Sequence, residues 1–183
     1  MKLINTGFDD LWLIEPVIHT DARGYFFESY SKPVFEKLGL DLTFVQDNQS
    51  WSKAGVIRGL HFQAPPVAQA KLIRVLSGGI WDVVVDLRKN KQTFGKVYGV
   101  ELSAANKLQL LVPKGFAHGF SVLTDSAEVL YKSDAPYAPQ LQRGLRYNDP
   151  QLNINWRIPS GLTPLISEAD KAWPTLKELE SYF

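Results

Sequence analysis

The sequence predicts a mainly β protein, an antiparallel sandwich or jelly-roll barrel with a few short helices at its periphery. Short runs rich in Val, Ile, Leu and aromatic residues recur along the chain, and the dominant period within them is two, as in half-buried strands. Gly, Asn, Asp, Ser or Pro separate these runs, as expected where turns connect strands. Many short strands at close spacing favour an antiparallel barrel over a βαβ fold.

The strand-like runs extend from the N-terminal region to about residue 132. No internal repeat, low-complexity tract or linker-like change in composition divides the chain, so we expect residues 1–183 to form a single domain. The runs that predict strands are Leu11–Ile18, Gly24–Tyr30, Leu42–Val45, Val56–Phe62, Leu72–Leu76, Ile80–Leu87, Val97–Leu102, Leu108–Val112, Phe120–Leu123 and Val129–Lys132.

Two short helices are expected outside the barrel. The first has Ser31 as a candidate cap, Pro33 near its start and Gly39 at its end. The second begins at Ser167 and runs through Asp170 towards Trp173. A barrel with peripheral helices has a natural ligand site in its mouth.

Composition excludes several function classes. Lys and Arg total 20 against 19 Asp and Glu, so no overall basic field attracts nucleic acid or anionic lipid. The absence of cysteine excludes disulfides, thiolate metal sites and a cysteine nucleophile. Neither a signal peptide nor a run long enough to span a membrane is apparent, so a cytoplasmic protein without a membrane partner is the expectation.

The segment Gly55–Gln63 carries the first candidate site residues. Strict alternation places His61 and Gln63 on one face of a strand and Arg58 on the other. Gly59 stands between Arg58 and His61, where a strand can bulge and redirect a side chain, so the two side chains can share a cavity. The alternative for His61 is an ordinary core or surface histidine.

The segment Pro113–Phe120 contains Pro-x-Gly-x-x-His and is similar to the second half of the cupin signature, whose histidine usually binds a metal. The first half of that signature requires His-x-His followed by Glu, whereas this chain has His61, Phe62 and Gln63. Three histidines in all, His19, His61 and His118, cannot supply a three-His-plus-Glu site. We therefore expect no metal and no cofactor.

An unmetallated His61 suits proton abstraction near neutral pH, with Asp170 as a candidate partner for its ring. Removing a proton beside a ketone builds negative charge on the carbonyl oxygen, which Lys71 can stabilise, with His118 as an alternative donor. Inversion also requires an acid on the opposite face, and Tyr131 is the candidate. Asp170 is equally plausible as a helix-end carboxylate, and Tyr131 as a strand residue that anchors the core.

A second group of candidates suits nucleotide binding. Arg23 precedes Gly24 and a cluster of aromatic residues, while Gln46 and Asn48 follow Phe44. Arginine can grip a phosphate through two hydrogen bonds, and amide side chains can read the edge of a pyrimidine. The alternative is an ordinary charged turn beside an aromatic strand.

Taken together, ten ordered segments closely resemble the dTDP-4-dehydrorhamnose 3,5-epimerase family, from about residue 10 to about residue 173. They are Asp21–Gly24, Phe44–Asn48, Gly55–Gln63, Ala70–Arg74, Trp81–Arg88, Phe94–Lys96, Leu102–Asn106, Pro113–Phe120, Leu130–Lys132 and Asn148–Pro150.

The resemblance implies a metal-free, cupin-type antiparallel jelly-roll barrel that forms homodimers. It implies an isomerase that epimerises C3 and C5 of dTDP-4-keto-6-deoxyglucose through an enolate, on the route to dTDP-L-rhamnose. In the family's pattern His61 is the base, Asp170 its partner, Tyr131 the acid and Lys71 the enolate stabiliser. The family's substrate-binding positions fall on Arg23, Glu28, Gln46, Asn48, Arg58 and His118, and because the family dimer exchanges N-terminal strands, Arg23 and Glu28 are expected in the neighbour's site.

Two positions depart from the family. Ala169 stands where the family often has Lys, and Gln142 stands where an acidic residue commonly precedes Arg143-Gly144. Both affect substrate contacts more than proton chemistry. The remaining alternatives are a mono-epimerase of a related dTDP-4-keto-deoxysugar, a non-catalytic nucleotide-sugar-binding cupin and a metal-dependent cupin enzyme.

Overall fold

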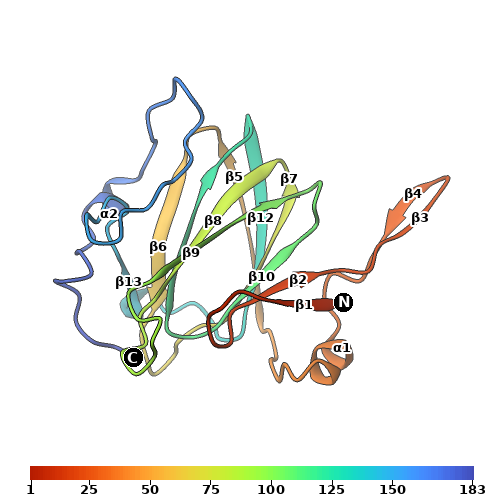
Figure 1. Cartoon of the computed structure of the whole chain (residues 1–183), viewed down its shortest axis with the longest axis horizontal. Helices are drawn as coiled ribbons and strands as arrows, with labels where there is room; N and C mark the ends of the chain where they lie inside the picture. The colour runs from red at the N-terminus through yellow and green to blue at the C-terminus, as the bar shows by residue number, and fades with distance from the viewer.

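The computed structural model describes all residues from 1 to 183 and contains two antiparallel sheets that form the barrel (Figure 1). The six-stranded sheet has the order β1-β2-β10-β7-β12-β5, and the five-stranded sheet has the order β13-β6-β11-β8-β9. The predicted fold class, an antiparallel jelly-roll barrel with few helices, is confirmed.

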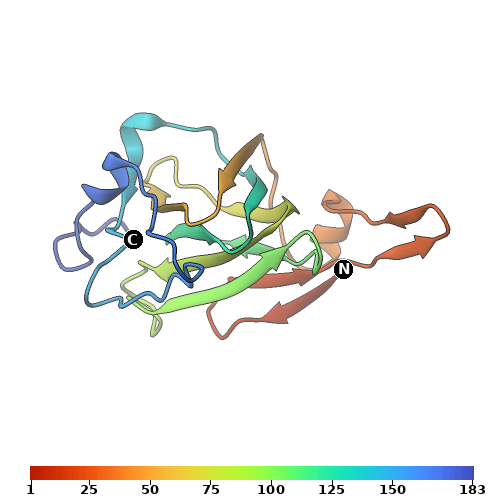
Figure 2. The same cartoon turned by 90° about the horizontal axis from the view of Figure 1, so that it is seen from above.

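The first sheet consists of β1 (Lys2–Asn5), β2 (Trp12–Glu15), β10 (Gln109–Val112), β7 (Lys71–Ser77), β12 (Ser126–Ser133) and β5 (Gln46–Lys53). The second consists of β13 (Gln142–Gly144), β6 (Ile57–Gln63), β11 (Phe116–Val122), β8 (Gly79–Asp86) and β9 (Val97–Ser103). A separate hairpin, β3 (His19–Asp21) and β4 (Gly24–Phe26), extends away from both sheets (Figure 2).

The two sheets enclose the main core. Inward-facing residues of both sheets, such as Ile73 and Val129 from one and Val84 and Phe120 from the other, belong to one buried cluster. Burying large apolar side chains in this way is the main source of folding free energy. One end of this interior carries polar side chains, and these form the site described below.

The outer faces of the sheets are covered by the two ends of the chain. The short helix α1 (Lys32–Lys37) places Phe35 in a cluster with Ile14, Leu72 and Leu111 of the six-stranded sheet. The segment after β13 contributes Trp156, among other residues, to a cluster on the five-stranded sheet. This segment contains α2 (Glu168–Lys171) near the C-terminus, and a 3₁₀ turn, Pro139–Leu141, leads into β13 ahead of it.

Most predicted strands are present, but one was placed wrongly. Leu42–Val45 is not a strand; Leu42 and Phe44 pack against the cluster around Phe35 instead. The strand lies immediately after it, at Gln46–Lys53. Its polar residues gave no hydrophobic run because it is an edge strand, paired only with β12.

Both predicted helices are present and short. Ser31 precedes α1 but its side chain makes no capping hydrogen bond. Ser167 caps α2, since its hydroxyl oxygen accepts a hydrogen bond from the Asp170 backbone N–H at 3.1 Å. None of the helices is long and apolar enough to cross a membrane.

Candidate active site

A cavity of about 600 Å³ opens at the polar end of the barrel. Its wall includes most of the candidate catalytic residues, because β6, β7, β11 and β12 all direct side chains towards it. A smaller hollow of about 280 Å³ adjoins it and shares four residues with it. The shared residues are His61, Lys71, Tyr131 and Gln142.

His61 and Asp170 form a hydrogen-bonded pair, although 109 positions separate them in the sequence. The Nε2 atom of His61 lies 2.6 Å from Oδ1 of Asp170. Since a carboxylate can only accept, Nε2 carries the hydrogen and Nδ1 is left as the free ring nitrogen. The imidazole is 28% exposed, so it can reach a ligand while Asp170 stays buried behind it.

Asp170 is held in place by more than the histidine. The backbone N–H of Gly59 donates to Oδ2 at 3.2 Å, and the indole N–H of Trp173 donates to Oδ1 at 3.4 Å. Burial opposes ionisation of this carboxyl, but the hydrogen bonds from His61, Gly59 and Trp173 outweigh it and lower the pKa of Asp170. Asp170 is therefore an anion at neutral pH and can stabilise a protonated His61.

Gly59 explains how Arg58 and His61 come to line the same cavity. Its φ is +120°, and a Cβ atom at this position would lie 2.5 Å from the Cα of Gly119 on β11. The pairing of β11 with β6 shifts register beside this contact, between His118 and Phe120. Only glycine fits this conformation and this approach, and the irregularity redirects the side chains of β6 as predicted.

Lys71 and Tyr131 lie on neighbouring strands of the opposite sheet. The Nζ atom of Lys71 is 5.9 Å from the centre of the Tyr131 ring. Burial lowers the pKa of Lys71 to about 8, against the opposing effect of the Asp82 carboxylate. Burial also raises the pKa of Tyr131, although the nearby charge of Arg58 opposes this. At neutral pH the cavity thus contains an ammonium and a phenol that keeps its proton.

A second histidine–carboxylate pair lies deeper in the barrel. Nε2 of His118 lies 2.6 Å from Oδ1 of Asp82, and both side chains are buried. His118 lines the cavity and pairs with His61 across β11 and β6. Sequence reasoning named His118 but missed Asp82. An acidic residue within the otherwise apolar run Ile80–Val85 was the signal that could have revealed it.

The remaining candidates divide into two groups. Arg58 lines the main cavity and donates to Ser52 Oγ at 2.9 Å, while Gln46 and Asn48 line the smaller hollow and bond to each other at 2.8 Å. Arg23 and Glu28 line neither cavity. Arg23 lies on the projecting hairpin, with 90% of its side chain exposed and paired to Asp21, and Glu28 lies exposed just beyond it.

The positions that depart from the family also line the main cavity. Gln142 and Ala169 both contribute to its wall, and the side-chain oxygen of Gln142 accepts a hydrogen bond from the hydroxyl of Tyr137. Gln142 lies on β13 and Ala169 on α2.

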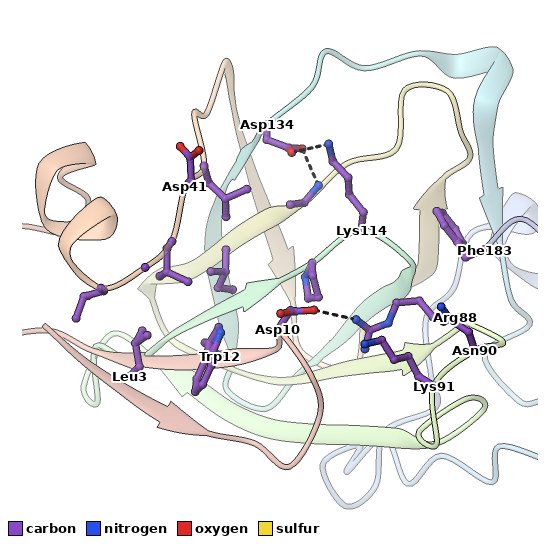
Figure 3. A pocket seen from close by; sticks show the side chains of 17 residues that line it. Leu3, Asp10, Trp12, Asp41, Arg88, Asn90, Lys91, Lys114, Asp134 and Phe183 are labelled. Carbon is purple, nitrogen blue, oxygen red and sulfur yellow. Dashed lines mark hydrogen bonds and ion pairs between the residues drawn. The ribbon is translucent and has the colours of Figure 1, made fainter.

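A larger cavity of about 750 Å³ lies elsewhere, between the N-terminal strands and the loop that carries Arg88 (Figure 3). Most of its charged groups are paired: Arg88 with Asp10, Lys91 with Asp9 and Lys114 with Asp134. It contains no histidine, and Asp41 is its one charged side chain outside an ion pair. Size alone therefore does not identify the active site.

No group of three or more His, Asp or Glu side chains in the structure could hold a metal ion. The two histidines of the cavity are each bonded to a separate carboxylate.

Known proteins match this sequence along nearly the whole chain. The family model for dTDP-4-dehydrorhamnose 3,5-epimerase matches residues 5–178. The enzyme of that name from Escherichia coli K12 is 47% identical over 180 residues, which cover 98% of this chain and 96% of the relative. The chain belongs to the dTDP-4-dehydrorhamnose 3,5-epimerase family.

Solved structures of the family superpose closely on this chain. The dTDP-4-dehydrorhamnose 3,5-epimerase from Elizabethkingia anophelis NUHP1 has a TM-score of 0.93 and 50% identity, with 100% of this chain and 99% of that chain covered. The epimerase from Legionella pneumophila Philadelphia 1, in complex with dTDP-4-keto-L-rhamnose, has a TM-score of 0.92 and 45% identity, with 98% and 94% covered. The cupin-type barrel inferred from the sequence is confirmed.

Proposed function

We propose that the chain epimerises C3 and C5 of dTDP-4-keto-6-deoxy-D-glucose and so produces dTDP-4-keto-L-rhamnose. The observation that carries this proposal is the pair of His61 and Asp170, which shares one cavity with Lys71 and Tyr131. Both carbons flank the C4 ketone, so a single base, an oxyanion stabiliser and an acid suffice for both inversions. We also propose that residues 1–183 act as one epimerase domain.

The base in this reaction is the free Nδ1 of His61. It takes the proton from C3 or C5, and Asp170 stabilises the imidazolium that forms. Negative charge then moves to the C4 oxygen, where the Lys71 ammonium stabilises the enolate. Tyr131 returns a proton to the opposite face of the same carbon. Solvent then takes the proton from the His61 imidazolium and restores the proton of the phenol, so both groups are ready for the second carbon. The step moves only protons, so substrate and product are isomers and no redox cofactor takes part.

Substrate binding is assigned to the residues around this centre. Arg58 supplies a positive charge for the diphosphate, and the amides of Gln46 and Asn48 supply donors and acceptors for the nucleotide in the adjoining hollow. His118 contacts the sugar from the floor of the cavity. A ligand that fills both spaces would extend from His118 to Asn48.

Arg23 and Glu28 fit this scheme if the protein is a homodimer. In a single chain they project from the body on or beside the β3–β4 hairpin (Figure 2). Tyr25 and Phe26 on the same hairpin are 61% and 68% exposed, an unusual arrangement for large aromatic side chains in a monomer. We propose that the hairpin reaches a second copy and places Arg23 beside its diphosphate.

Proton exchange with solvent tests the reaction. Incubation of the keto sugar nucleotide with the protein in deuterated water is expected to place deuterium at both C3 and C5, as read by NMR of the product. Label at C3 or C5 alone would identify a mono-epimerase. Binding of the nucleotide sugar without any label would contradict catalysis and support a non-catalytic binding protein.

A further inference from the structure

The Asp82 carboxylate has an unusual environment. It is fully buried on β8, and its Oδ1 accepts a hydrogen bond from His118 while Oδ2 has no partner in the protein. An unpaired buried carboxylate oxygen costs folding free energy, and buried polar groups in native proteins almost always have partners. An apolar side chain here would avoid that cost, so the negative charge itself calls for an explanation.

The charged groups of the cavity supply an explanation for the charge of Asp82. Lys71 shares the cavity with His118, and the charge of Asp82 acts on Lys71 without a salt bridge between them. Asp170 is the one carboxylate that lines this cavity, and it is already bonded to His61, Gly59 and Trp173. The remaining titratable or charged groups that line the two hollows are Arg58, His61, His118, Tyr131 and Tyr137.

Burial works against a charged Lys71. Desolvation lowers the pKa of its ammonium to about 8, and Asp82 is the group that counters this effect. Without the carboxylate, the same burial would favour the neutral amine more strongly. An amine cannot stabilise an enolate as an ammonium does.

We propose that Asp82 is a positioning residue with two tasks: it holds His118 so that Nδ1 faces the cavity, and it provides the counter-charge that keeps Lys71 an ammonium. The proposal rests on the function proposed above. One buried carboxylate thereby organises both Lys71, which stabilises the enolate, and His118, which contacts the sugar.

The pH dependence of kcat in the Asp82→Asn variant tests the counter-charge. Asparagine keeps the shape and removes the charge. The wild-type rate is expected to decline as pH rises through about 8, because Lys71 then loses its proton. In the variant this decline is expected at lower pH, and kcat near pH 7.5 is expected to fall at least about tenfold, as for loss of other oxyanion stabilisation.

Asp86→Asn is the matched control. Asp86 lies on the same strand, is equally buried and pairs with Arg88 outside the cavity. This variant is expected to lose stability without moving the decline in kcat. A decline that stays at its wild-type pH in Asp82→Asn, or that moves equally in Asp86→Asn, would overturn the counter-charge role.

NMR of the wild-type protein provides a test that needs neither a folded variant nor a substrate. The ¹⁵N spectrum of the three histidine rings is expected to show a proton on Nε2 of His118 near neutral pH. A ring with a proton on Nδ1 and none on Nε2 would refute the positioning of His118. Because this test is independent of turnover, its failure is distinguishable from failure of the proposed reaction.

Discussion

His61 and His118 are both held through Nε2 by a carboxylate at 2.6 Å, yet the two pairs differ in their surroundings. Asp170 accepts hydrogen bonds from two further donors, Gly59 and Trp173, and lies at the cavity wall, whereas Asp82 is fully buried with one oxygen unpaired. The exposed ring, His61, is free to exchange protons with a ligand. The ring of His118 is buried, so it is suited to a contact of fixed geometry with a ligand.

Lys71 gives the clearest prediction at the scale of a residue. In Lys71→Arg the guanidinium stays protonated at every pH used for assay, so the decline of kcat above about pH 8 should disappear, although the maximal rate should be lower because the larger group is misplaced. The pH profile of kcat measures this. Lys114→Arg, outside the cavity and paired with Asp134, should keep the decline. An unchanged decline in Lys71→Arg would mean that another group titrates there.

Individual site residues were only partly predictable. His61 and Lys71 stood out from their local sequence, and the family resemblance supplied the role of Asp170. Neither periodicity nor spacing in the sequence could predict the contact between Asp170 and His61, because this contact depends on how the C-terminal segment crosses β6. Asp82 was missed because a single acid in a buried strand has no local pattern that marks a site.

Among the structural elements, β6 determines the geometry of the site. Its glycine allows close approach to β11, and its backbone N–H at Gly59 binds the same carboxylate that holds His61. The bulge at Gly59 therefore helps to set the position of His61. Any change that separates β6 from β11 should also displace His61 from Asp170.

Gly59→Ala tests this link. The added Cβ meets the backbone of Gly119 at 2.5 Å, in a region of φ that disfavours alanine, so we expect a loss of roughly 2–4 kcal/mol in unfolding free energy and a sharply reduced kcat. Urea unfolding and turnover measure the two effects. Gly7→Ala is the control, because its φ is also positive but open space surrounds it. Equal effects of both substitutions would show that strain alone is responsible.

Strands with apolar residues were predicted well, including the edge strand β9, whereas the polar edge strand β5 was not. The edge strand β5 consists of polar residues, and its neighbour Leu42–Val45 is apolar because it packs on α1. Hydrophobic content thus pointed to the wrong segment. The physical reason is that an edge strand is defined by its backbone pairing, here with β12, and not by burial of its side chains.

At the scale of the whole molecule, the hairpin is the part that a single chain does not explain. Its aromatic side chains and Arg23 are exposed, and it packs on neither sheet (Figure 1). The sequence predicted strand character for this region, and only the family resemblance indicated a partner for it. Residues that would contact a second copy follow no periodic pattern, so the sequence of one chain does not mark them.

A mixing experiment tests the exchange of hairpins. Arg23→Ala and His61→Ala are each expected to be impaired. If Arg23 serves the partner's site, co-refolding the two variants creates mixed dimers with one intact site each, so activity should rise to about a quarter of the wild-type value by random assortment of subunits. Turnover after mixing, with light scattering to confirm the dimer, measures this. Activity no greater than the sum of the separate variants would place Arg23 outside the neighbour's site.

The central claim is that one imidazole removes both protons and one phenol returns them from the opposite face. The most direct measurement is solvent deuterium exchange at C3 and C5 in the His61→Ala and Tyr131→Phe variants, followed together with inversion. His61→Ala should lose exchange at both carbons, whereas Tyr131→Phe should retain exchange but lose inversion. Undiminished exchange in His61→Ala, or equal loss of exchange and inversion in Tyr131→Phe, would contradict this division of roles.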